Sequence, residues 1–453
     1  MNYDLLIHDG IVVTETAIVE MDIAVKEGKI AALGKLDEKM TADHEIDAKN
    51  LVVFPGLVDP HVHFREPGPN EEEDFYTGSR AAAAGGVTTV LEQPVDSPPT
   101  TTVERFNEKI QIAKQKSFVD FGLWGGVVPD NLDEIEGLTL AGACFFKAFI
   151  CSSDPIYPMV DDGVMLRAMQ KISACGKAIA IHAENQSIVE CFTAMFNKLP
   201  SVRGSDYVTS RPAIAETEAI QRMIFLAKHA NVNLHILHLS AAEGADLIAQ
   251  AQKTGQKVTV ETCPHYLVLD NKSMDVYGPY AKCNPPLREK DNQEKLWRAL
   301  RNGTISCLVS DHSPYTSEDK DSGLEDIRLA PPGINGLELG LPLMISEGVH
   351  AGKATLIDLA LWMSTNPAKL MGIYPQKGHI SIGADADFVL VDPKKKWEVV
   401  SEKLETKNKW SPYAGWQLQG KVMQTILRGK TVYQEGTFLK GAGYGKFVPC
   451  HLP

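Results

Sequence analysis

Short apolar runs alternate with longer amphipathic segments through the middle of the chain. The apolar runs extend over 57–63, 87–92, 119–127, 143–149, 178–182, 234–239, 257–261 and 306–311. Between them, segments such as VERFNEKIQIAKQK and ETEAIQRMIFLAKHA carry apolar residues at the spacing of an α-helix. This alternation predicts an α/β fold with a parallel sheet covered by helices, and eight such units predict a (β/α)8 barrel, the TIM barrel. A doubly wound sheet is the alternative, which we disfavour because no glycine-rich phosphate loop follows the first strand.

The two ends of the chain have a different pattern. DLLIHDGIVV and MDIAVKEGKIAALG precede the barrel, and ADFVLVD and QTILRGKTVY follow it; each is a strand or strand pair next to a tight-turn signal. Because chain ends often lie close together, we expect one small β-sandwich domain built from both termini. The expected division is 1–52 for its N-terminal part, 53–375 for the barrel, and 376–453 for its C-terminal part and tail.

Composition and charge exclude several classes of protein. The chain has 453 residues, of which 44% are hydrophobic and 23% charged, with a formal net charge of −13. Nucleic acids and anionic membranes bind basic faces, so neither is an expected partner. There is no secretory signal pattern and no apolar run long enough to span a bilayer, which predicts a cytoplasmic protein. Eight scattered cysteines without a CxxC pair predict reduced thiols that fill the core.

Ionisable side chains lie at or inside the ends of the predicted strands. In LVVFPGLVDPHVHFR, two histidines stand two residues apart, and residues i and i+2 of a strand share a face. The strand ends of a barrel converge on the face where active sites lie. A single buried histidine is usually a satisfied core residue, but a metal centre explains the whole set together. The set consists of His61, His63, Lys147, His182, His238 and Asp311.

The ligand types and their number suggest two metal ions. Imidazole and carboxylate groups suit zinc and similar first-row ions. Four histidines and one aspartate exceed the three protein ligands of one catalytic zinc. Lys147 is explained if it loses its proton in a buried site, because the neutral amine can then react with CO2. The product is a carbamate, an anion able to bridge two cations.

Several motifs resemble one enzyme family. PGLVDPHVHFREPG, IHAEN, ETCPHYL, VSDHSP and SPYAG are similar to the cyclic amidohydrolase branch of the amidohydrolase superfamily, which contains dihydroorotases, allantoinases and hydantoinases. The resemblance extends over essentially the whole chain. It implies one zinc, or another divalent first-row metal, on His61, His63 and Asp311, and a second on His182 and His238. Lys147, as N6-carboxylysine, and a hydroxide would bridge the two. It also implies a homo-oligomer, a dimer or tetramer.

Within this branch, DFGLWGGVVPDN and YVTSRP resemble allantoinases most closely. The expected substrate is therefore a cyclic ureide, the hydantoin ring of allantoin, which would be opened to allantoate. The bridging hydroxide would attack the ring amide, and Asp311 would serve as the catalytic proton shuttle. A dihydroorotase and a hydantoinase or dihydropyrimidinase stay open as alternatives. A metal-free scaffold of the same fold is disfavoured because all six ligand positions are filled. His235 and His265 do not match family ligand positions, and we expect them to be supporting residues.

Other positions depart from the allantoinase pattern. Arg65 and Asn284 are similar to dihydroorotase residues, and in that family the arginine holds the substrate carboxylate. Tyr315 stands where dihydroorotases have a histidine that contacts the same carboxylate, and PGIN at 332–335 replaces the allantoinase WGGIAG. Asp96 replaces an asparagine and could neutralise Arg65 or accept hydrogen bonds from a ureido group; Arg65 could also pair with Glu66. The expected substrate contacts are Arg65, Asp96, Asn284, Tyr315, Pro332, Gly333 and Asn335.

Overall fold

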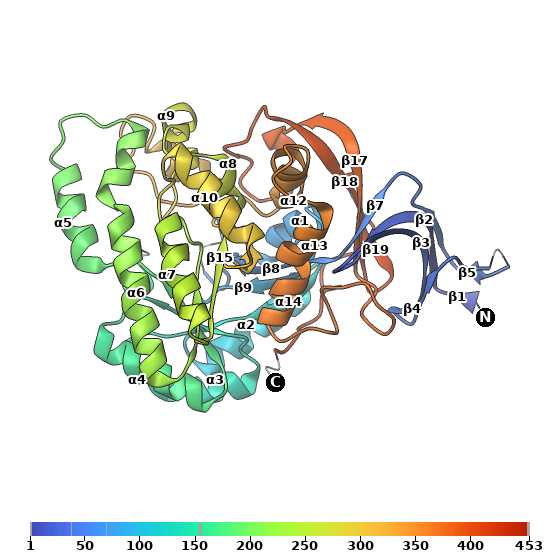
Figure 1. The fold of residues 1–453 in the computed structure, drawn as a ribbon, viewed down its shortest axis with the longest axis horizontal. Helices are drawn as coiled ribbons and strands as arrows, with labels where there is room; N and C mark the ends of the chain where they lie inside the picture. Colours follow the sequence, from blue (N-terminus) through green and yellow to red (C-terminus); the bar gives the residue numbers. More distant parts are fainter. Residues whose placement is uncertain (1, 38, 69, 154–155, 451–453) are drawn as a thin grey trace.

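The computed structural model describes residues 2–37, 39–68, 70–153 and 156–450. Figure 1 shows a helix-covered part, coloured from cyan to orange, next to a β-rich part that contains the N-terminus. None of the helices in the described ranges combines the length and the apolar content that crossing a bilayer requires.

Parallel strands form the centre of the helix-covered part. One sheet has the order β10-β9-β8 and the other the order β11-β12-β13-β14-β15-β16, and all neighbouring strands are parallel. A parallel bridge between Val62 and His312 connects the end of β8 to the segment after β16. The strands are β8 (Leu57–Val62), β9 (Val87–Glu92), β10 (Asp120–Leu123), β11 (Gly125–Gly126), β12 (Phe146–Phe149), β13 (Ala178–His182), β14 (Asn233–Ile236), β15 (Val258–Thr262) and β16 (Cys307–Leu308).

The strand predicted over 119–127 is divided at Trp124. The backbone N–H of Trp124 donates to the Glu92 carbonyl of β9, whereas that of Gly125 donates to the Phe145 carbonyl next to β12. The chain therefore changes its pairing partner at this residue. The indole Nε1 of Trp124 donates to the Pro60 carbonyl at 2.9 Å, which holds the side chain between the two sheets.

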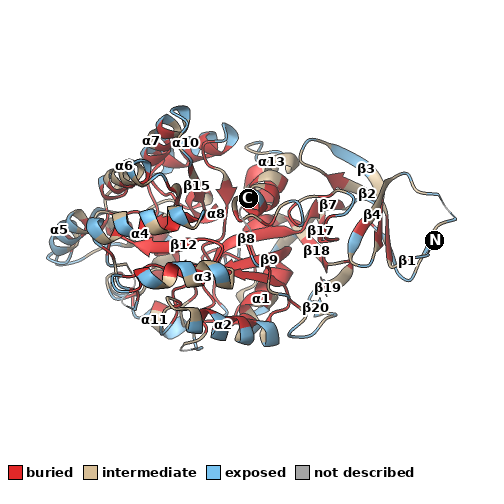
Figure 2. Ribbon diagram, turned by 90° about the horizontal axis from the view of Figure 1, so that it is seen from below, coloured by how far each residue is buried: buried red, intermediate tan, exposed pale blue. Residues whose placement is uncertain are grey.

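Helices cover the parallel strands, with their buried faces turned inward and their exposed faces outward (Figure 2). Several begin at a side chain that accepts a backbone N–H of the first turn, such as Asp74, Thr102 and Asp161. The helices are α1 (Phe75–Ala84), α2 (Val103–Lys116), α3 (Ile135–Ala141), α4 (Asp162–Ala174), α5 (Gln186–Phe196), α6 (Ala213–Ala230), α7 (Ala242–Lys253), α8 (Pro264–Val268), α9 (Ser273–Tyr277), α10 (Lys290–Arg301), α11 (Ser317–Asp321), α12 (Gly340–Leu343), α13 (Leu356–Ala360) and α14 (Asn366–Leu370). Shorter 3₁₀ turns are Leu132–Glu134, Gly204–Ser210, Gly278–Ala281 and Ser401–Lys403, and π-helical turns are Met344–Val349 and Leu361–Thr365.

Strands from both ends of the chain form one nine-stranded sheet. β7 pairs with β2 from the N-terminal segment and with β17 from the C-terminal segment, so it joins the two. Buried side chains from both segments, including Val53 and Phe388, belong to one apolar cluster. The strands are β2 (Leu5–Val13), β3 (Ile18–Lys26), β4 (Lys29–Gly34), β6 (Glu45–Asp47), β7 (Val52–Pro55), β17 (Phe388–Glu398), β18 (Gln417–Leu427), β19 (Lys430–Gln434) and β20 (Thr437–Phe438). β1 (Asn2–Tyr3) pairs with β5 (Thr41–Ala42).

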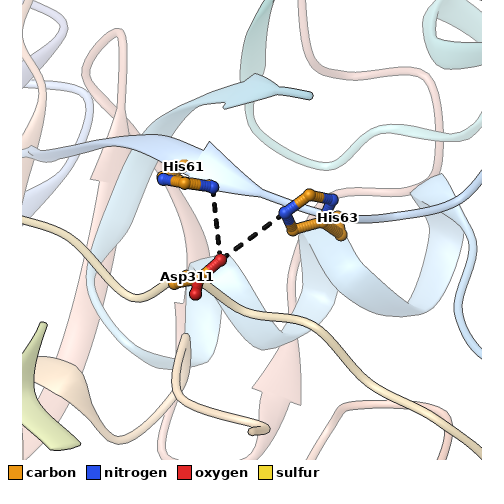
Figure 3. Close-up of side chains that lie close together, drawn as sticks. All are labelled: His61, His63 and Asp311. Atoms are coloured by element: carbon orange, nitrogen blue, oxygen red, sulfur yellow. Dashed lines mark ion pairs between the residues drawn. The ribbon is translucent and has the colours of Figure 1, made fainter. Parts of the chain in front are cut away.

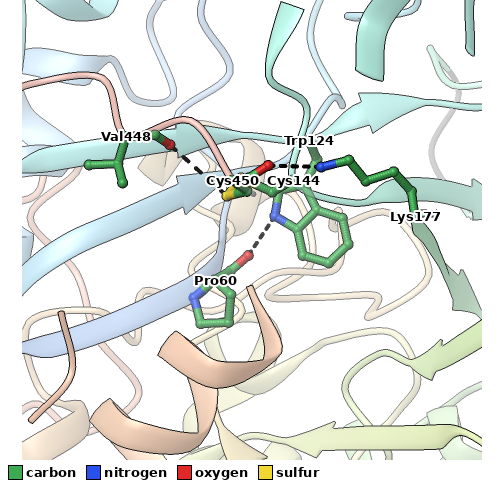
Figure 4. The surroundings of a disulfide bond; sticks show 6 residues. All are labelled: Pro60, Trp124, Cys144, Lys177, Val448 and Cys450. Carbon is green, nitrogen blue, oxygen red and sulfur yellow. Dashed lines mark hydrogen bonds between the residues drawn. A yellow bond between two sulfur atoms is a disulfide. The ribbon is translucent and has the colours of Figure 1, made fainter. Parts of the chain in front are cut away.

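The expectation that the cysteines are all reduced is wrong for Cys144 and Cys450, which form a disulfide across 306 residues of sequence (Figure 4). The C-terminal segment runs beside β10, where Phe121 N donates to the Lys446 carbonyl and Val448 N to the Phe121 carbonyl. Lys177 Nζ also donates to the Cys450 carbonyl at 2.8 Å. Nothing in the spacing of the cysteines indicates this contact. The other six cysteines are free.

A buried lysine joins the C-terminal segment to the parallel sheet. Lys377 Nζ lies 2.7 Å from Asp120, 3.0 Å from Asp385 and 2.7 Å from Asp387. Burial by itself lowers the pKa of Lys377, but the surrounding aspartates outweigh it and hold that pKa above its ordinary value. The three carboxylates resemble a cation site, and the ammonium group of Lys377 occupies the space between them.

Lys377→Met is therefore expected to destabilise the fold by about 3–5 kcal/mol, because it removes the cation that three buried carboxylates share. Asp120 keeps its ion pair with Arg428 and Asp385 keeps that with Lys29, but buried Asp387 loses its counter-charge. Urea unfolding monitored by circular dichroism measures the change. The matched control is Lys394→Met, at an exposed position on β17, which should stay within about 0.5 kcal/mol of the unaltered protein. Equal stabilities of the two variants would contradict the prediction.

Candidate metal centre

The first group of candidate ligands gathers where β8 ends. His61 is in β8, His63 follows it, and Asp311 lies just after β16. The Asp311 Oδ1 atom is 3.2 Å from His61 Nε2 and 3.5 Å from His63 Nε2 (Figure 3). The two imidazoles point to one carboxylate because the residues share a face of the strand. The sequence-based expectation that these three side chains meet agrees with the structure.

The second group adjoins the first. His182, the last residue of β13, has its Nδ1 atom 3.0 Å from Nε2 of His238, which follows β14. The His238 and His61 ring centroids are 5.4 Å apart. Lys147, in β12, has its Nζ atom 3.3 Å from His61 Nε2 and 4.9 Å from the centroid of the Phe149 ring. All six candidate ligands thus lie in one buried cluster, with the lysine beside a histidine of the first group.

Backbone conformation helps to aim these side chains. His238 has φ +33° and Asp311 has φ +46°, and Arg65, at the mouth of the site, has φ +56°. Left-handed conformations of residues other than glycine are uncommon and cluster at functional sites, where the surrounding structure holds them. The apolar pattern of the sequence carries no signal for them.

Two buried glutamates hold the imidazoles in place. Glu261 Oε1 makes a short contact with His61 Nδ1, and its Oε2 atom lies 3.0 Å from His235 Nε2. Glu184 Oε2 lies 2.7 Å from His182 Nε2, and Arg211 donates to both oxygens of Glu184. Carboxylates that hydrogen bond to metal-binding imidazoles fix their orientation and tautomer. This arrangement gives His235 the supporting role expected from the sequence.

The charges of this cluster keep both glutamates ionised. Burial raises the pKa of Glu184, but Arg211 and His182 outweigh it, so that pKa lies well below its ordinary value. For Glu261, His61 and His235 outweigh burial in the same direction. Sequence analysis missed both glutamates and Arg211. A glutamate at the end of an apolar strand, close to a histidine as in IHAEN and ETCPHYL, is the signal that could have identified Glu184 and Glu261.

The histidines fit metal ligation. Burial, reinforced by nearby Lys147, His61 and His182, holds the pKa values of His63 and His238 well below their ordinary range, so both imidazoles are neutral. Neutral imidazole is the form that binds a metal. The Nδ1 atoms of both residues are buried and have no hydrogen-bond partner among the described residues. Burial also raises the pKa of Asp311, with His61 and Lys147 opposing it.

A small cavity of about 50 Å³ lies against these ligands and opens near an outer hollow of about 670 Å³. Five of the seven expected substrate contacts line the cavity. Among them, Arg65 stacks on the Tyr315 ring at 4.7 Å and donates from Nη2 to Ser313 Oγ at 3.0 Å. These five are Arg65, Asn284, Tyr315, Pro332 and Gly333.

The structure places the other two elsewhere. Asp96 pairs with Lys109 at 2.6 Å and lines only the outer hollow, so it does not neutralise Arg65 by direct contact. Asn335 donates its amide to the Asn408 and Trp410 carbonyls and does not line the cavity. Arg65 forms an ion pair with Glu72, whose Oε2 atom lies 2.6 Å from Arg65 Nε, and not the expected one with Asp96 or Glu66. Lys109 of α2 therefore determines the position of the Asp96 side chain, and residues 404–410 determine that of the Asn335 side chain.

A buried histidine–aspartate cluster at the ends of parallel strands, next to a small cavity, is the arrangement of a metal-dependent hydrolase. The chain belongs to the amidohydrolase family, whose model matches residues 52–432. It is 40% identical over 451 residues to an L-hydantoinase of Paenarthrobacter aurescens, with 98% of both chains covered. It is 38% identical over 457 residues to an allantoinase of Escherichia coli O139:H28, with 100% of both covered.

Solved structures agree with this assignment. The L-hydantoinase (dihydropyrimidinase) from Arthrobacter aurescens superposes with a TM-score of 0.97 at 39% identity, over 99% of this chain and 100% of that one. The dihydropyrimidinase from Brevibacillus agri NCHU1002 superposes with a TM-score of 0.92 at 32% identity, over 99% of both chains. The chain is thus a hydrolase of cyclic amides, of the hydantoinase and allantoinase type, as expected from its motifs.

Proposed function

We propose that this enzyme opens the ring of a five-membered cyclic ureide that carries no carboxylate, with allantoin as the substrate and allantoate as the product. The observation that carries the proposal is the ion pair between Arg65 and Glu72 at the cavity mouth. Arg65 Nε and Glu72 Oε2 are 2.6 Å apart, and the side chains are 7% and 21% exposed. A carboxylate on the substrate ring would meet the charge of Glu72 next to the only arginine of the cavity wall among the described residues. The allantoinase-like motifs support the same substrate.

A hydantoinase acting on substituted hydantoins is the second candidate. The outer hollow of about 670 Å³ provides room for a substituent on the ring, and exposed Leu329 and Ile156 lie on its rim. The 40% identity to an L-hydantoinase also favours it. Parallel assays with allantoin, a 5-benzyl hydantoin, dihydrouracil and dihydroorotate separate the candidates. Allantoin should give the highest kcat/KM, and a higher value for dihydroorotate would contradict the proposal.

Glu72→Gln is expected to shift specificity towards a carboxylated ring. Removing the negative charge of Glu72 removes its repulsion of a substrate carboxylate at the cavity mouth, so kcat/KM for dihydroorotate relative to allantoin should rise about tenfold. The control is Glu71→Gln, which changes the same charge at an exposed neighbouring position. An unchanged ratio in Glu72→Gln would show that this glutamate does not govern selection.

The residues of the cluster fit two divalent metal ions, and we propose zinc. His61, His63 and Asp311 would hold one ion, His182 and His238 the other, and carboxylated Lys147 would contact both. When bound, such ions lower the pKa of water towards neutrality and polarise an amide carbonyl. Glu261 and Glu184 hold the imidazoles in the orientation that ligation requires.

The chain's own groups carry out the remaining work. The carboxylate of Asp311 takes a proton from the attacking water and delivers it to the departing ring nitrogen. Asn284 offers an amide to the ring, and Pro332 and Gly333, which also line the cavity, exclude water. Arg65, stacked on Tyr315, forms the outer edge of the cavity.

Further features of the molecule follow from the same proposal. We infer that the two parallel sheets form one (β/α)8 barrel, supported by the bridge between Val62 and His312. We also propose the division 1–52, 53–375 and 376–453. The sheet that joins β7 to β17 supports a small β-sandwich domain built from both ends of the chain. A cytoplasmic location stays a prediction, and the Cys144–Cys450 bond is the observation that speaks against it.

A homo-oligomer is the proposed assembly. Phe192 and Met195 are exposed on α5, and Leu199 is exposed shortly after it. The helix α5 lies at the edge of the molecule in Figure 2. Exposed apolar groups gathered on a helix are typical of interaction surfaces. Light scattering after gel filtration should give a mass of two or four chains.

A further inference from the structure

Two buried lysines lie behind one wall of the cavity. Lys282 is 4% exposed and Lys320 is fully buried. In the part of the chain that the structure describes, no carboxylate lies within ion-pair distance of either ammonium group. Both are directed at backbone carbonyls of residues 327–333. A cation buried without a counter-charge is costly, so its retention needs an explanation.

The two ammonium groups bind this segment at several points. Lys282 Nζ donates to the carbonyls of Ile327 at 2.7 Å, Ala330 at 2.5 Å and Arg328 at 3.4 Å. Lys320 Nζ donates to the carbonyls of Gly333 at 2.8 Å and Pro331 at 3.0 Å, and lies 3.5 Å from that of Lys282. Hydrogen bonds from a charged donor are stronger than those from a neutral donor. Residues 327–333 are thus held from behind by the side-chain nitrogens of two buried lysines.

The segment so held forms part of the cavity. Pro332 and Gly333 face the same space as the candidate metal ligands. Gly333 N donates to the Lys282 carbonyl at 2.8 Å, and a Cβ placed on Gly333 would lie 2.1 Å from the Ser313 carbonyl oxygen. The wall is therefore packed closely against the loop whose Ser313 hydroxyl accepts from Arg65. A small displacement of this segment would change the width of the cavity.

Lys282 also contacts the tyrosine that holds Asn284, another residue of the cavity lining. Its Nζ atom lies 4.6 Å from the centroid of the Tyr207 ring. The Tyr207 hydroxyl donates to Asn284 Oδ1 at 2.6 Å, and Asn284 lines the cavity. One ammonium group therefore touches both the segment that carries Pro332 and the tyrosine that orients Asn284. Burial, followed by nearby Arg211, lowers the pKa of Lys282 to about 7, with Asp326 opposing, which shows how strongly the surroundings disfavour this charge.

We propose that Lys282 and Lys320 are positioning residues for the substrate ring. They hold residues 327–333 at a fixed distance from Asn284, so that the ring fits between Pro332 and the amide. Neither lysine lines the cavity, so both act through other residues. This inference rests on the proposed hydrolysis of a cyclic ureide.

The test uses Lys282→Met and Lys320→Met in the metal-loaded enzyme. In each variant, KM for allantoin should rise about tenfold, whereas kcat should stay within about twofold of the value of the unaltered enzyme. The reason is that the lysines affect binding of the ring equally in the ground state and in the transition state. Metal content should equal that of the unaltered enzyme. Hydrogen exchange measured by mass spectrometry should be faster in the peptide that covers 327–336. Lys282→Gln, which keeps a neutral donor, is measured if the methionine variant fails to fold.

Lys272→Met is the matched control, because Lys272 is exposed and lies near Lys282 in sequence. It should leave KM, kcat and exchange unchanged. Unchanged KM in both buried-lysine variants would overturn the inference, whether or not exchange is faster. A fall in kcat with unchanged KM would overturn it too. Failure of the proposed function is distinguishable from failure of this inference, because the unaltered enzyme would then hydrolyse no cyclic ureide. In that case, the rate of hydrogen exchange in residues 327–336 of the two variants would still decide whether the lysines hold this segment in place.

Discussion

Replacing Asp311 with asparagine is expected to lower kcat by about a hundredfold to ten-thousandfold while the metal content stays at two ions per chain. Asparagine has the same shape and keeps one carbonyl oxygen as a ligand near His61 and His63, which are 3.2 and 3.5 Å from Asp311 Oδ1. It cannot accept and release a proton at neutral pH. General acid–base catalysis supplies a factor of this size.

The measurement combines steady-state kinetics with elemental analysis of the purified variant. Asp130→Asn, at an exposed position, is the control for a lost carboxylate and should keep full activity. Full turnover in Asp311→Asn would remove the proposed proton shuttle. Loss of one metal together with activity would assign Asp311 a ligand role alone.

Replacing Lys147 with methionine is expected to abolish measurable turnover and to reduce the metal content to one ion per chain or none. Methionine fills a similar volume next to His61 and Phe149 but cannot form a carbamate. Without that anion, two cations in one buried cluster would repel each other. Lys147→Arg keeps a positive charge, but its guanidinium group does not react with CO2. This variant should therefore lose turnover and metal as Lys147→Met does.

Two further measurements test the carbamate directly. Mass spectrometry of the native, metal-loaded enzyme should show the added mass of one CO2, and the mass should be lost on acidification. Reconstitution of the metal-free protein should be faster and more complete with bicarbonate than without it. Lys198→Met, at an exposed position, is the control and should retain both ions. A full metal content in Lys147→Met would contradict the bridging role.

The parallel strands were predictable from the sequence because they are buried on both faces. β9 and β13 coincide with predicted runs, and β15 differs from its run by one residue at each end. Such strands read as continuous apolar segments whatever their neighbours are. The division of the third strand at Trp124 was not predictable, because it depends on where the chain leaves β9 and begins to pair with β12.

The meeting of the candidate ligands was also predictable. His61 and His63 share a strand face, and Lys147, His182 and Asp311 lie in or close to other parallel strands. The carboxyl ends of such strands lie at one side of the fold, so side chains distant in sequence must come together there. The hydrogen-bond partners of these side chains were harder to predict from the sequence. Glu184 and Glu261 stood in quoted motifs, but their contacts with imidazoles depend on side-chain direction.

Contacts at the rim of the site were decided by distant segments. Asp96 was expected near Arg65, but Lys109 of α2 reaches it, and Arg65 turns to Glu72. Asn335 was expected at the substrate, but residues 404–410 provide carbonyls that take its amide. In each case several polar partners were chemically suitable, and packing selected one.

The sequence by itself therefore determined the class of fold, the convergence of six ionisable side chains and the family, because each depends on local apolar spacing or on residues that follow a strand. Only the tertiary structure decided the Arg65–Glu72 pair, the two lysines behind 327–333 and the bond between Cys144 and Cys450. These contacts join segments or side chains whose relative orientation is set by packing of the whole chain. A pattern read along the sequence contains the spacing of residues but not the direction in which a loop side chain points.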